Sequence, residues 1–107
     1  MADEILLAIS TFPDAETATR IARQLVTEKL AACANIGAPV QSIYHWQGNI
    51  EEAQETIVFF KTTAARFEEF QGRLRSLHPY EVPEVVALRI ADGLPDYLRW
   101  VAESCAV

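Results

Sequence analysis

The stretch His78-Pro79-Tyr80-Glu81-Val82-Pro83-Glu84 decides the architecture of the second half of this chain. Two prolines within seven residues remove two backbone donors, so neither a helix nor a central strand runs through the segment. The residue that precedes each proline is driven toward an extended conformation. We therefore predict a stiff, extended connector that follows one helix and leads into a strand.

The same connector carries an imidazole, a phenol and two carboxylates, on His78, Tyr80, Glu81 and Glu84. In one interpretation it forms part of a binding site, because these groups are held on a backbone with little freedom. In the other it is only a helix stop followed by a strand entry, and His78 caps the helix end. Connectors flanked by proline are common and sites are few per protein, so these residues alone favour the second interpretation.

The composition is that of one folded domain over residues 1–107. Half of the residues are hydrophobic (50%), which excludes a disordered chain. The formal net charge is −6 and no cluster of Lys or Arg is present, so we expect no nucleic-acid partner. The apolar run at residues 5–9 is too short for a membrane span or a signal-peptide core, and two distant cysteines indicate a reducing compartment. We expect a soluble cytoplasmic protein with no membrane partner.

Hydrophobic periodicity predicts a strand and then a helix in the first third of the chain. The continuous apolar run at residues 5–9 fits a strand that is buried on both faces. Asp14 is a candidate N-cap, and apolar residues then recur at helical spacing, which predicts a helix over about residues 14–30. The apolar positions of this helix are Ala18, Ile21, Ala22, Leu25 and Val26.

A long β-hairpin is predicted next. Residues 41–46 have strand composition, residues 47–49 are a turn signal, and residues 55–62 are rich in β-branched and aromatic side chains. Arms of this length place Tyr44 and Trp46 too far out for the rest of a domain of this size to bury them. Exposed strand edges and aromatic rings are usually paired or covered, so the hairpin favours a partner subunit.

The remaining pattern completes the fold class. A helix is predicted over about residues 65–77, a strand over residues 84–90, and a short terminal helix that Asp96 caps. The order is β-α-β-β-α-β followed by a short helix. This order predicts an α+β protein, the ferredoxin-like sandwich in which helices cover one face of a mainly antiparallel sheet.

Few residues carry metal or ligand chemistry. His78 together with Glu81 or Glu84 offers nitrogen and oxygen ligands, and Cu(II) binds such sets more strongly than other divalent first-row ions. The alternative is a surface or capping histidine. Lys61 ends an apolar strand and requires an acidic partner if it is partly buried, for which Glu84 is a candidate. The alternative for Lys61 is an ordinary exposed strand end.

The remaining candidate residues and motifs do not favour catalysis. Trp46 and Tyr44 favour interface packing over a ligand platform, because aromatic side chains dominate interface energetics. The sequence contains no glycine-rich phosphate loop, no Cys-x-x-Cys and no nucleophile elbow. We therefore expect no enzymatic activity and no soft-thiolate metal site.

Six segments match a known family in order and spacing, and together they cover nearly the whole chain. They are residues 11–14, 28–36, 43–48, 60–62, 78–84 and 97–100. The connector His-Pro-Tyr-x-x-Pro-Glu and the hairpin Tyr-x-Trp-x-Gly are the most specific as a pair. On these residues the chain resembles the CutA family of divalent-cation tolerance proteins.

The resemblance implies a ferredoxin-like subunit in a tight homotrimer, similar in shape to the PII signalling proteins, whose long hairpins extend the sheets of neighbouring subunits. It also implies clefts between the subunits. Their lining residues would be Trp46, Lys61, His78, Tyr80, Glu84 and Trp100. Copper ligands proposed in the family include a cysteine at the position of Ser10 and paired histidines at the positions of Leu77 and His78. Of these ligands only His78 remains in this chain.

Two functional hypotheses follow. The first is a trimeric cytoplasmic protein that binds divalent cations such as Cu(II), with His78, Glu81 and Glu84 as ligands, and contributes to metal tolerance. The second is a PII-like signalling or scaffold trimer that binds a small anionic ligand in the cleft between subunits, with Lys61 as the anion contact.

Overall fold

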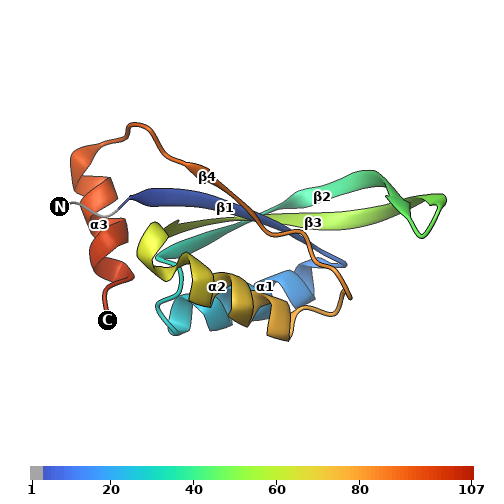
Figure 1. Cartoon of the computed structure of the whole chain (residues 1–107), viewed down its shortest axis with the longest axis horizontal. Coiled ribbons are helices and arrows are strands. Elements are labelled where there is room, and N and C mark those ends of the chain that lie inside the picture. Colours follow the sequence, from blue (N-terminus) through green and yellow to red (C-terminus); the bar gives the residue numbers. More distant parts are fainter. Residues whose placement is uncertain (1–3) are drawn as a thin grey trace.

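The computed structural model describes residues 4–107, which form four strands and three helices (Figure 1). The elements are β1 (Ile5–Phe12), α1 (Ala15–Thr27), β2 (Cys33–Trp46), β3 (Asn49–Thr63), α2 (Ala64–Leu77), β4 (Val86–Arg89) and α3 (Pro95–Ser104). The predicted α+β order and the short C-terminal helix are confirmed. Among the helices of residues 4–107, none has the length and hydropathy that a membrane span requires.

The strands form one antiparallel sheet in the order β2-β3-β1-β4. The register of β1 against β3 runs from Ile5 opposite Thr63 to Phe12 opposite Thr56. The helices α1 and α2 lie side by side on one side of this sheet, and the β2–β3 hairpin projects beyond them (Figure 1). This is the ferredoxin-like arrangement, in which one face of the sheet is covered.

Helix α1 is shorter than the sequence predicts. The Asp14 carboxylate accepts a hydrogen bond from the backbone N–H of Thr17 at 2.7 Å, so the predicted N-cap is confirmed. This hydrogen bond holds the pKa of Asp14 below its ordinary value. The helix ends at Thr27 because Lys29 takes a left-handed conformation with φ 61°, which closes the helix as an αL residue does.

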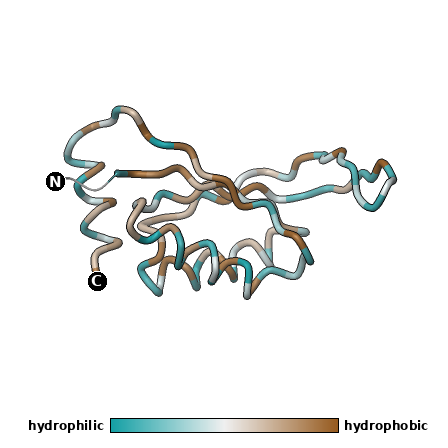
Figure 2. The backbone as a smooth tube through the Cα atoms, viewed as in Figure 1, coloured by the Kyte–Doolittle hydropathy of each residue, from teal (hydrophilic) through white to brown (hydrophobic). Residues whose placement is uncertain are grey.

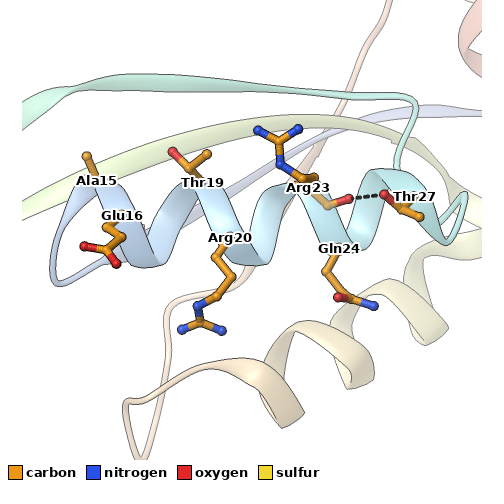
Figure 3. Close-up of a pocket in the computed structure, with 7 residues that line it drawn as sticks. All are labelled: Ala15, Glu16, Thr19, Arg20, Arg23, Gln24 and Thr27. Carbon is orange, nitrogen blue, oxygen red and sulfur yellow. Dashed lines mark hydrogen bonds between the residues drawn. The ribbon is translucent and has the colours of Figure 1, made fainter.

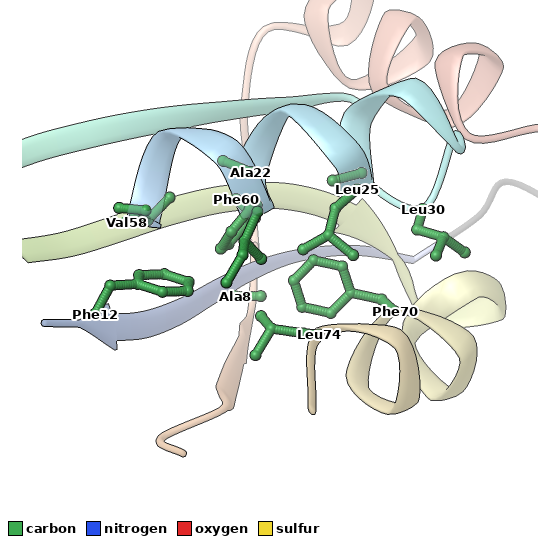
Figure 4. Packing of buried hydrophobic residues seen from close by; sticks show 12 residues of the cluster. Ala8, Phe12, Ala22, Leu25, Leu30, Val58, Phe60, Phe70 and Leu74 are labelled. Atoms are coloured by element: carbon green, nitrogen blue, oxygen red, sulfur yellow. The ribbon is translucent and has the colours of Figure 1, made fainter. Parts of the chain in front are cut away.

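The core lies between the two helices and the sheet. Phe12, Phe60 and Phe70 are fully buried there, and the rings of Phe60 and Phe70 meet edge to face at 5.0 Å (Figure 4). Leu25 from α1 and Leu74 from α2 close the cluster. A second, smaller cluster holds α3 against the sheet. Its buried members are Ile5, Ala32, Val101 and Cys105.

The hairpin is longer than the apolar pattern predicts. β2 begins at Cys33 and β3 begins at Asn49, and the ladder continues past a register shift between Ile36 and Pro39. Gly37 permits this passage, because a Cβ at that position would lie 3.0 Å from the carbonyl oxygen of Ile57. At the tip, Gln47 and Gly48 both have positive φ, as a two-residue type I′ turn requires.

The last two elements differ in detail from the prediction. β4 spans Val86–Arg89 rather than residues 84–90, because the extended backbone after Pro83 joins the ladder with β1 only at Val86. The prediction that Asp96 caps the terminal helix is wrong. Leu94 occupies the N-cap, and Pro95 supplies a φ that is already suited to the first helical residue. Asp96 accepts a hydrogen bond from Arg99 instead, at 3.0 Å.

The sheet face opposite the helices is apolar and exposed. Register places Leu88 opposite Leu7 and Val86 opposite Ile9, with Phe59 as the next neighbour of Ile9. Leu88 is 57% exposed, Val86 48% and Phe59 36%. β1 is coloured as hydrophobic over most of its length (Figure 2). The open face therefore resembles a surface that is usually covered in an assembly.

Candidate functional site

His78 connects the end of α2 to the connector of residues 78–84. It is the C-cap of α2, and its ψ of 136° shows the extended backbone expected before Pro79. Its ring is only 8% exposed and stacks on Phe12 with centroids 4.7 Å apart. The capping interpretation of His78 is confirmed by this position, and the ring is buried rather than on the surface.

Both nitrogens of the His78 ring are engaged by the protein. Nδ1 accepts a hydrogen bond from the backbone N–H of Tyr80 at 3.1 Å, which leaves the ring proton on Nε2. Nε2 then donates to the carbonyl oxygen of Thr11 at 2.7 Å. Burial lowers the pKa of His78, which favours the neutral ring that this hydrogen-bond pattern requires. A metal ion binds an imidazole through a free lone pair, so in this conformation His78 would have to release Tyr80 first.

Tyr80 ties the connector to the hairpin. Its hydroxyl donates to Oε2 of Glu55 at 2.7 Å, and its ring lies 4.6 Å from that of His78. Burial, together with the hydrogen bond to Glu55, holds the pKa of the Tyr80 phenol well above its usual range. The connector is thus held at two successive points, by His78 to β1 and by Tyr80 to β3.

A cleft of about 750 Å³ opens between the connector and the hairpin, and we call it the connector cleft. Three carboxylates line it, on Glu55, Glu81 and Glu84, and no lysine or arginine does. Glu81 and Glu84 are exposed, whereas Glu55 is only 8% exposed. The other lining residues are Thr11, Ser42, Ile43, Tyr44, His45, Trp46, Tyr80 and Val82. Aromatic rings and negative charge therefore meet in one concave surface.

The structure brings together some of the predicted site residues and separates others. Trp46, Tyr80, Glu81 and Glu84 share the connector cleft, with His78 buried behind Tyr80. Trp100 lies on α3, at the opposite end of the molecule from the hairpin tip (Figure 1). The assignment of distant residues to a cleft between subunits stays a prediction, because a single chain does not test it.

Lys61 does not pair with Glu84. Its ammonium donates to the side-chain oxygen of Asn35, and β3 places it opposite Leu7 and Cys33. The candidate ion pair with Glu84 is therefore not formed among the described residues, and Lys61 is half-buried rather than an ordinary exposed strand end. Asn35 lies on the adjacent strand β2, where its side-chain oxygen accepts the hydrogen bond from the ammonium.

No preformed metal centre is present in the part of the chain that the structure describes. In residues 4–107, no three His, Cys, Asp or Glu side chains gather in a way that would hold an ion. Ser10, at the position of a proposed family ligand, is fully buried, and its hydroxyl has no hydrogen-bond partner among these residues. The single chain thus offers exposed carboxylates for an ion rather than a finished ligand set.

Glu55 is the residue of the cleft that the sequence analysis missed. It stands at the start of the apolar run of residues 55–62, where an acid looks like an ordinary solvated strand end. A signal was available in the alternation, because Glu55 falls in phase with Ile57 and Phe59. Those residues lie on the open face and not under the helices, so the phase places Glu55 on the face that Phe59 shares, and its burial comes from the Tyr80 contact.

A second hollow lies on the outer surface of α1 and contains none of the predicted site residues. Figure 3 shows Glu16, Arg20 and Gln24 along one side of the helix. The only hydrogen bond drawn there is from the hydroxyl of Thr27 to the carbonyl oxygen of Arg23, at 2.7 Å. A hollow that a single helix lines offers little enclosure, so the connector cleft remains the candidate site.

Comparison with known proteins agrees with the fold. Residues 6–104 match the family model of the CutA1 divalent ion tolerance protein. The chain is 47% identical over 102 residues to the divalent-cation tolerance protein CutA of Thermus thermophilus, covering 95% of this chain and 97% of that one. A solved structure of the Thermus thermophilus protein superposes with a TM-score of 0.93, at 45% identity and with 95% and 99% of the two chains covered.

A more distant solved relative shows the same fold. The structure described as a periplasmic divalent cation tolerance protein CutA from Archaeoglobus fulgidus has a TM-score of 0.91 at 36% identity, with 95% of this chain and 99% of that chain covered. Family model, sequence identity and fold agree over almost the whole length. The chain therefore belongs to the CutA1 divalent ion tolerance family.

Proposed function

We propose that this protein contributes to divalent-cation tolerance by binding divalent cations, Cu(II) first among them, as a homotrimer. The observation that carries the proposal is the connector cleft, in which Glu81 and Glu84 present exposed carboxylates and no lysine or arginine opposes a cation. The net charge of −6 attracts cations to the protein as a whole. We assign the protein no catalytic step, in keeping with a family that is named for tolerance.

The ligands in this proposal are mainly oxygens. Glu81 and Glu84 supply carboxylates, and water completes the coordination of the ion. His78 joins them only when its Nδ1 gives up the hydrogen bond from Tyr80. Cu(II) gains most from an added imidazole, so this exchange distinguishes copper from ions that prefer oxygen.

The trimer is supported by two features of the single chain. The radius of gyration is 14.4 Å, against about 13 Å for a compact chain of this length, and the excess comes from the projecting hairpin. The open face presents Leu88, Val86 and Phe59 to solvent. Neighbouring copies of the chain in a trimer would cover both the hairpin and the open face.

The test is native mass spectrometry of chelator-treated protein with and without added Cu(II). We expect a trimer that takes up a defined number of ions, and weaker uptake in the double variant Glu81→Gln/Glu84→Gln. The matched control Glu68→Gln/Glu103→Gln makes the same charge change at exposed positions outside the cleft. Equal uptake by both double variants rejects the cleft as the site, and a metal-free trimer rejects copper binding.

His78→Ala separates the two kinds of ligand. If the imidazole joins the ion, this variant loses Cu(II) while it keeps an oxygen-preferring ion such as Mg²⁺. The anionic-ligand alternative receives less support from the single chain, because three carboxylates line the cleft and Lys61 is held by Asn35. Binding of an anion that Lys61→Ala abolishes and chelator leaves unchanged would favour that alternative.

The proposed compartment is the cytoplasm. Its support is the pair of free thiols on Cys33 and Cys105, because unpaired cysteines are typical of reducing compartments. The relative from Archaeoglobus fulgidus is described as periplasmic. Fractionation of cells that express this protein distinguishes the two locations.

A further inference from the structure

Glu55 is a buried carboxylate without a cation. Its side chain is more than nine-tenths buried, yet it lines the connector cleft. Oε2 accepts the hydrogen bond from Tyr80, and Oε1 accepts none from residues 4–107. None of the ion pairs formed by these residues includes Glu55. Oε1 is not sealed from solvent, so it opens to the cleft, where a cation from outside the chain would give Glu55 the counter-charge that residues 4–107 do not supply.

We propose that the connector cleft binds an organic cation with N–H donors, a primary ammonium or a guanidinium, seated on Glu55 beside Tyr80, in the cleft that Tyr44 and Trp46 also line. This goes beyond the proposed role in divalent-cation binding and does not depend on it. The two ligands use different parts of the cleft. Glu81 and Glu84 are exposed and suit a hydrated ion, whereas Glu55 is only 8% exposed and accepts the hydrogen bond from Tyr80.

The sign of the ligand follows from the charges that face the cleft. Three carboxylates line it, and His45 is the one lining residue with a nitrogen base. A cation that enters is attracted by all three carboxylates, and it gives Glu55 the charge partner that the chain lacks. An anion meets the opposite field and leaves Glu55 uncompensated.

The class of cation follows from the rings. Tyr44, Trp46 and Tyr80 all line the cleft. The faces of such rings attract ammonium and guanidinium groups, most strongly for tryptophan. A single largely buried carboxylate is a poor site for Mg²⁺ or Ca²⁺, which require several oxygen ligands. The free Oε1 of Glu55 accepts an N–H, so donor-bearing cations are favoured over quaternary ones.

This chemistry has two sources, a free amine or guanidine and a basic side chain from a second copy of this chain. The cleft volume of about 750 Å³ accommodates either one. The two sources predict different ligand binding by the assembled protein. A free ligand binds the assembled protein, whereas a basic side chain from a neighbouring copy fills the cleft during assembly and excludes a free ligand.

The experiment titrates chelator-treated protein with n-propylguanidinium and n-propylammonium and follows the amide and indole resonances by NMR. Chelator removes divalent ions, so the result is independent of metal binding. For a free ligand we expect the shifts to centre on Tyr80 and Glu55, with tetramethylammonium binding more weakly because it has no N–H. Glu55→Gln should weaken binding about tenfold or more, since a hydrogen bond to a charged group is lost.

Two further variants control for charge and for loss of folding. Glu68→Gln makes the same charge change on an exposed position of α2 and should alter the affinity less than about twofold. Tyr44→Leu removes an exposed ring and should weaken binding about threefold, at little risk to folding. Tyr44→Leu thus provides a second test if Glu55→Gln does not fold.

The oligomeric state, measured by sedimentation on the same variants, identifies the source. If a second copy supplies the cation, the assembled wild-type protein gives no shifts and Glu55→Gln weakens assembly about tenfold or more, while Glu68→Gln does not. If neither titration nor assembly depends on Glu55, the proposal is overturned. Equal binding of tetramethylammonium and of an anion such as propionate also overturns it.

Discussion

The two halves of strand β3 follow the same backbone pattern but lie in opposite environments. Its second half carries Val58, Phe60 and Thr62, which are fully buried beneath α1 and α2. Its first half pairs only with β2 and carries Ile50 into solvent near the hairpin tip. One half of the strand is therefore stabilised within the chain. The other half pairs with β2 but lacks the cover of the helices and a second neighbouring strand.

This contrast divides the sources of stability. The helix-covered half should set the free energy of unfolding of a single chain, because its apolar side chains leave water completely. The hairpin half should set assembly and ligand binding, because its apolar and aromatic groups remain available. Substitutions in the two halves should consequently be distinguishable by their dependence on protein concentration.

The largest expected effect is in the helix-covered half. Phe70→Ala removes a fully buried ring that meets Phe60 at 5.0 Å and should lower the free energy of unfolding by about 3–5 kcal/mol. Urea unfolding measures this loss, which should not depend on protein concentration. The matched variant Phe59→Ala, on the open face, should show a loss that grows as the protein is diluted across its assembly range. A Phe70→Ala loss below about 1 kcal/mol would contradict the contrast.

Trp46→Ala tests the hairpin half directly. If Trp46 anchors a neighbouring subunit, its removal should weaken assembly by about 2 kcal/mol or more. Sedimentation equilibrium measures the change, and the melting temperature of the wild-type protein should rise with concentration. A trimer that is unchanged by this substitution would remove Trp46 from the interface.

Tyr80→Phe tests the junction between the two halves. It deletes the hydroxyl that donates to Glu55 and should cost about 1.5 kcal/mol, because a buried carboxylate then loses its donor. Chemical unfolding measures the cost. The double variant Tyr80→Phe/Glu55→Gln should recover part of it, since the neutral amide is easier to bury. Additive losses in the double variant would show that the two side chains do not act as a pair.

The smallest expected effect is a pH dependence from His78. Burial lowers the pKa of His78 in the folded protein, so the unfolded chain binds a proton more readily. The contribution to stability is therefore complete above the unfolded pKa of about 6.5 and is lost as pH falls toward the lower folded value. The slope from one proton is at most about 1.4 kcal/mol per pH unit.

Comparison with His78→Gln isolates this contribution in urea titrations between neutral and mildly acidic pH. The variant should lose the part of the slope that belongs to the imidazole. An identical slope in both proteins would place the pH dependence elsewhere, for example in carboxylates such as Asp14, whose pKa is lowered by its own hydrogen bond.

Local chemistry made the order of the elements predictable. Asp14 caps the start of α1, and α2 ends just before the first proline of the connector. Both signals depend only on residues close by in the sequence. The full length of the hairpin was not predictable in the same way. Residues 49–54 contain acids and amides with little apolar alternation, and they join the ladder through their pairing with β2.

The candidate site was predicted in part for the same reason. Tyr80, Glu81 and Glu84 are close in sequence and carry a phenol and two carboxylates, so the sequence alone marks the connector as a candidate site. Glu55 lies far from them in the chain and reaches them only through the antiparallel fold. The partner of Lys61 was likewise decided by strand pairing, which brings Asn35 beside it. Long-range partners depend on register, which local patterns do not specify.

The position of β2 at the edge of the sheet has a consequence for how the chain avoids aggregation. β2 is fourteen residues long, and on its outer side it has no neighbouring strand among residues 4–107. Such an edge is a template for uncontrolled pairing between molecules. Pro39 lacks an N–H and sits at the register shift, so it interrupts the template and divides it into two short segments. In chains that have not yet assembled, Pro39 therefore limits edge-to-edge pairing of β2 and so opposes fibril growth.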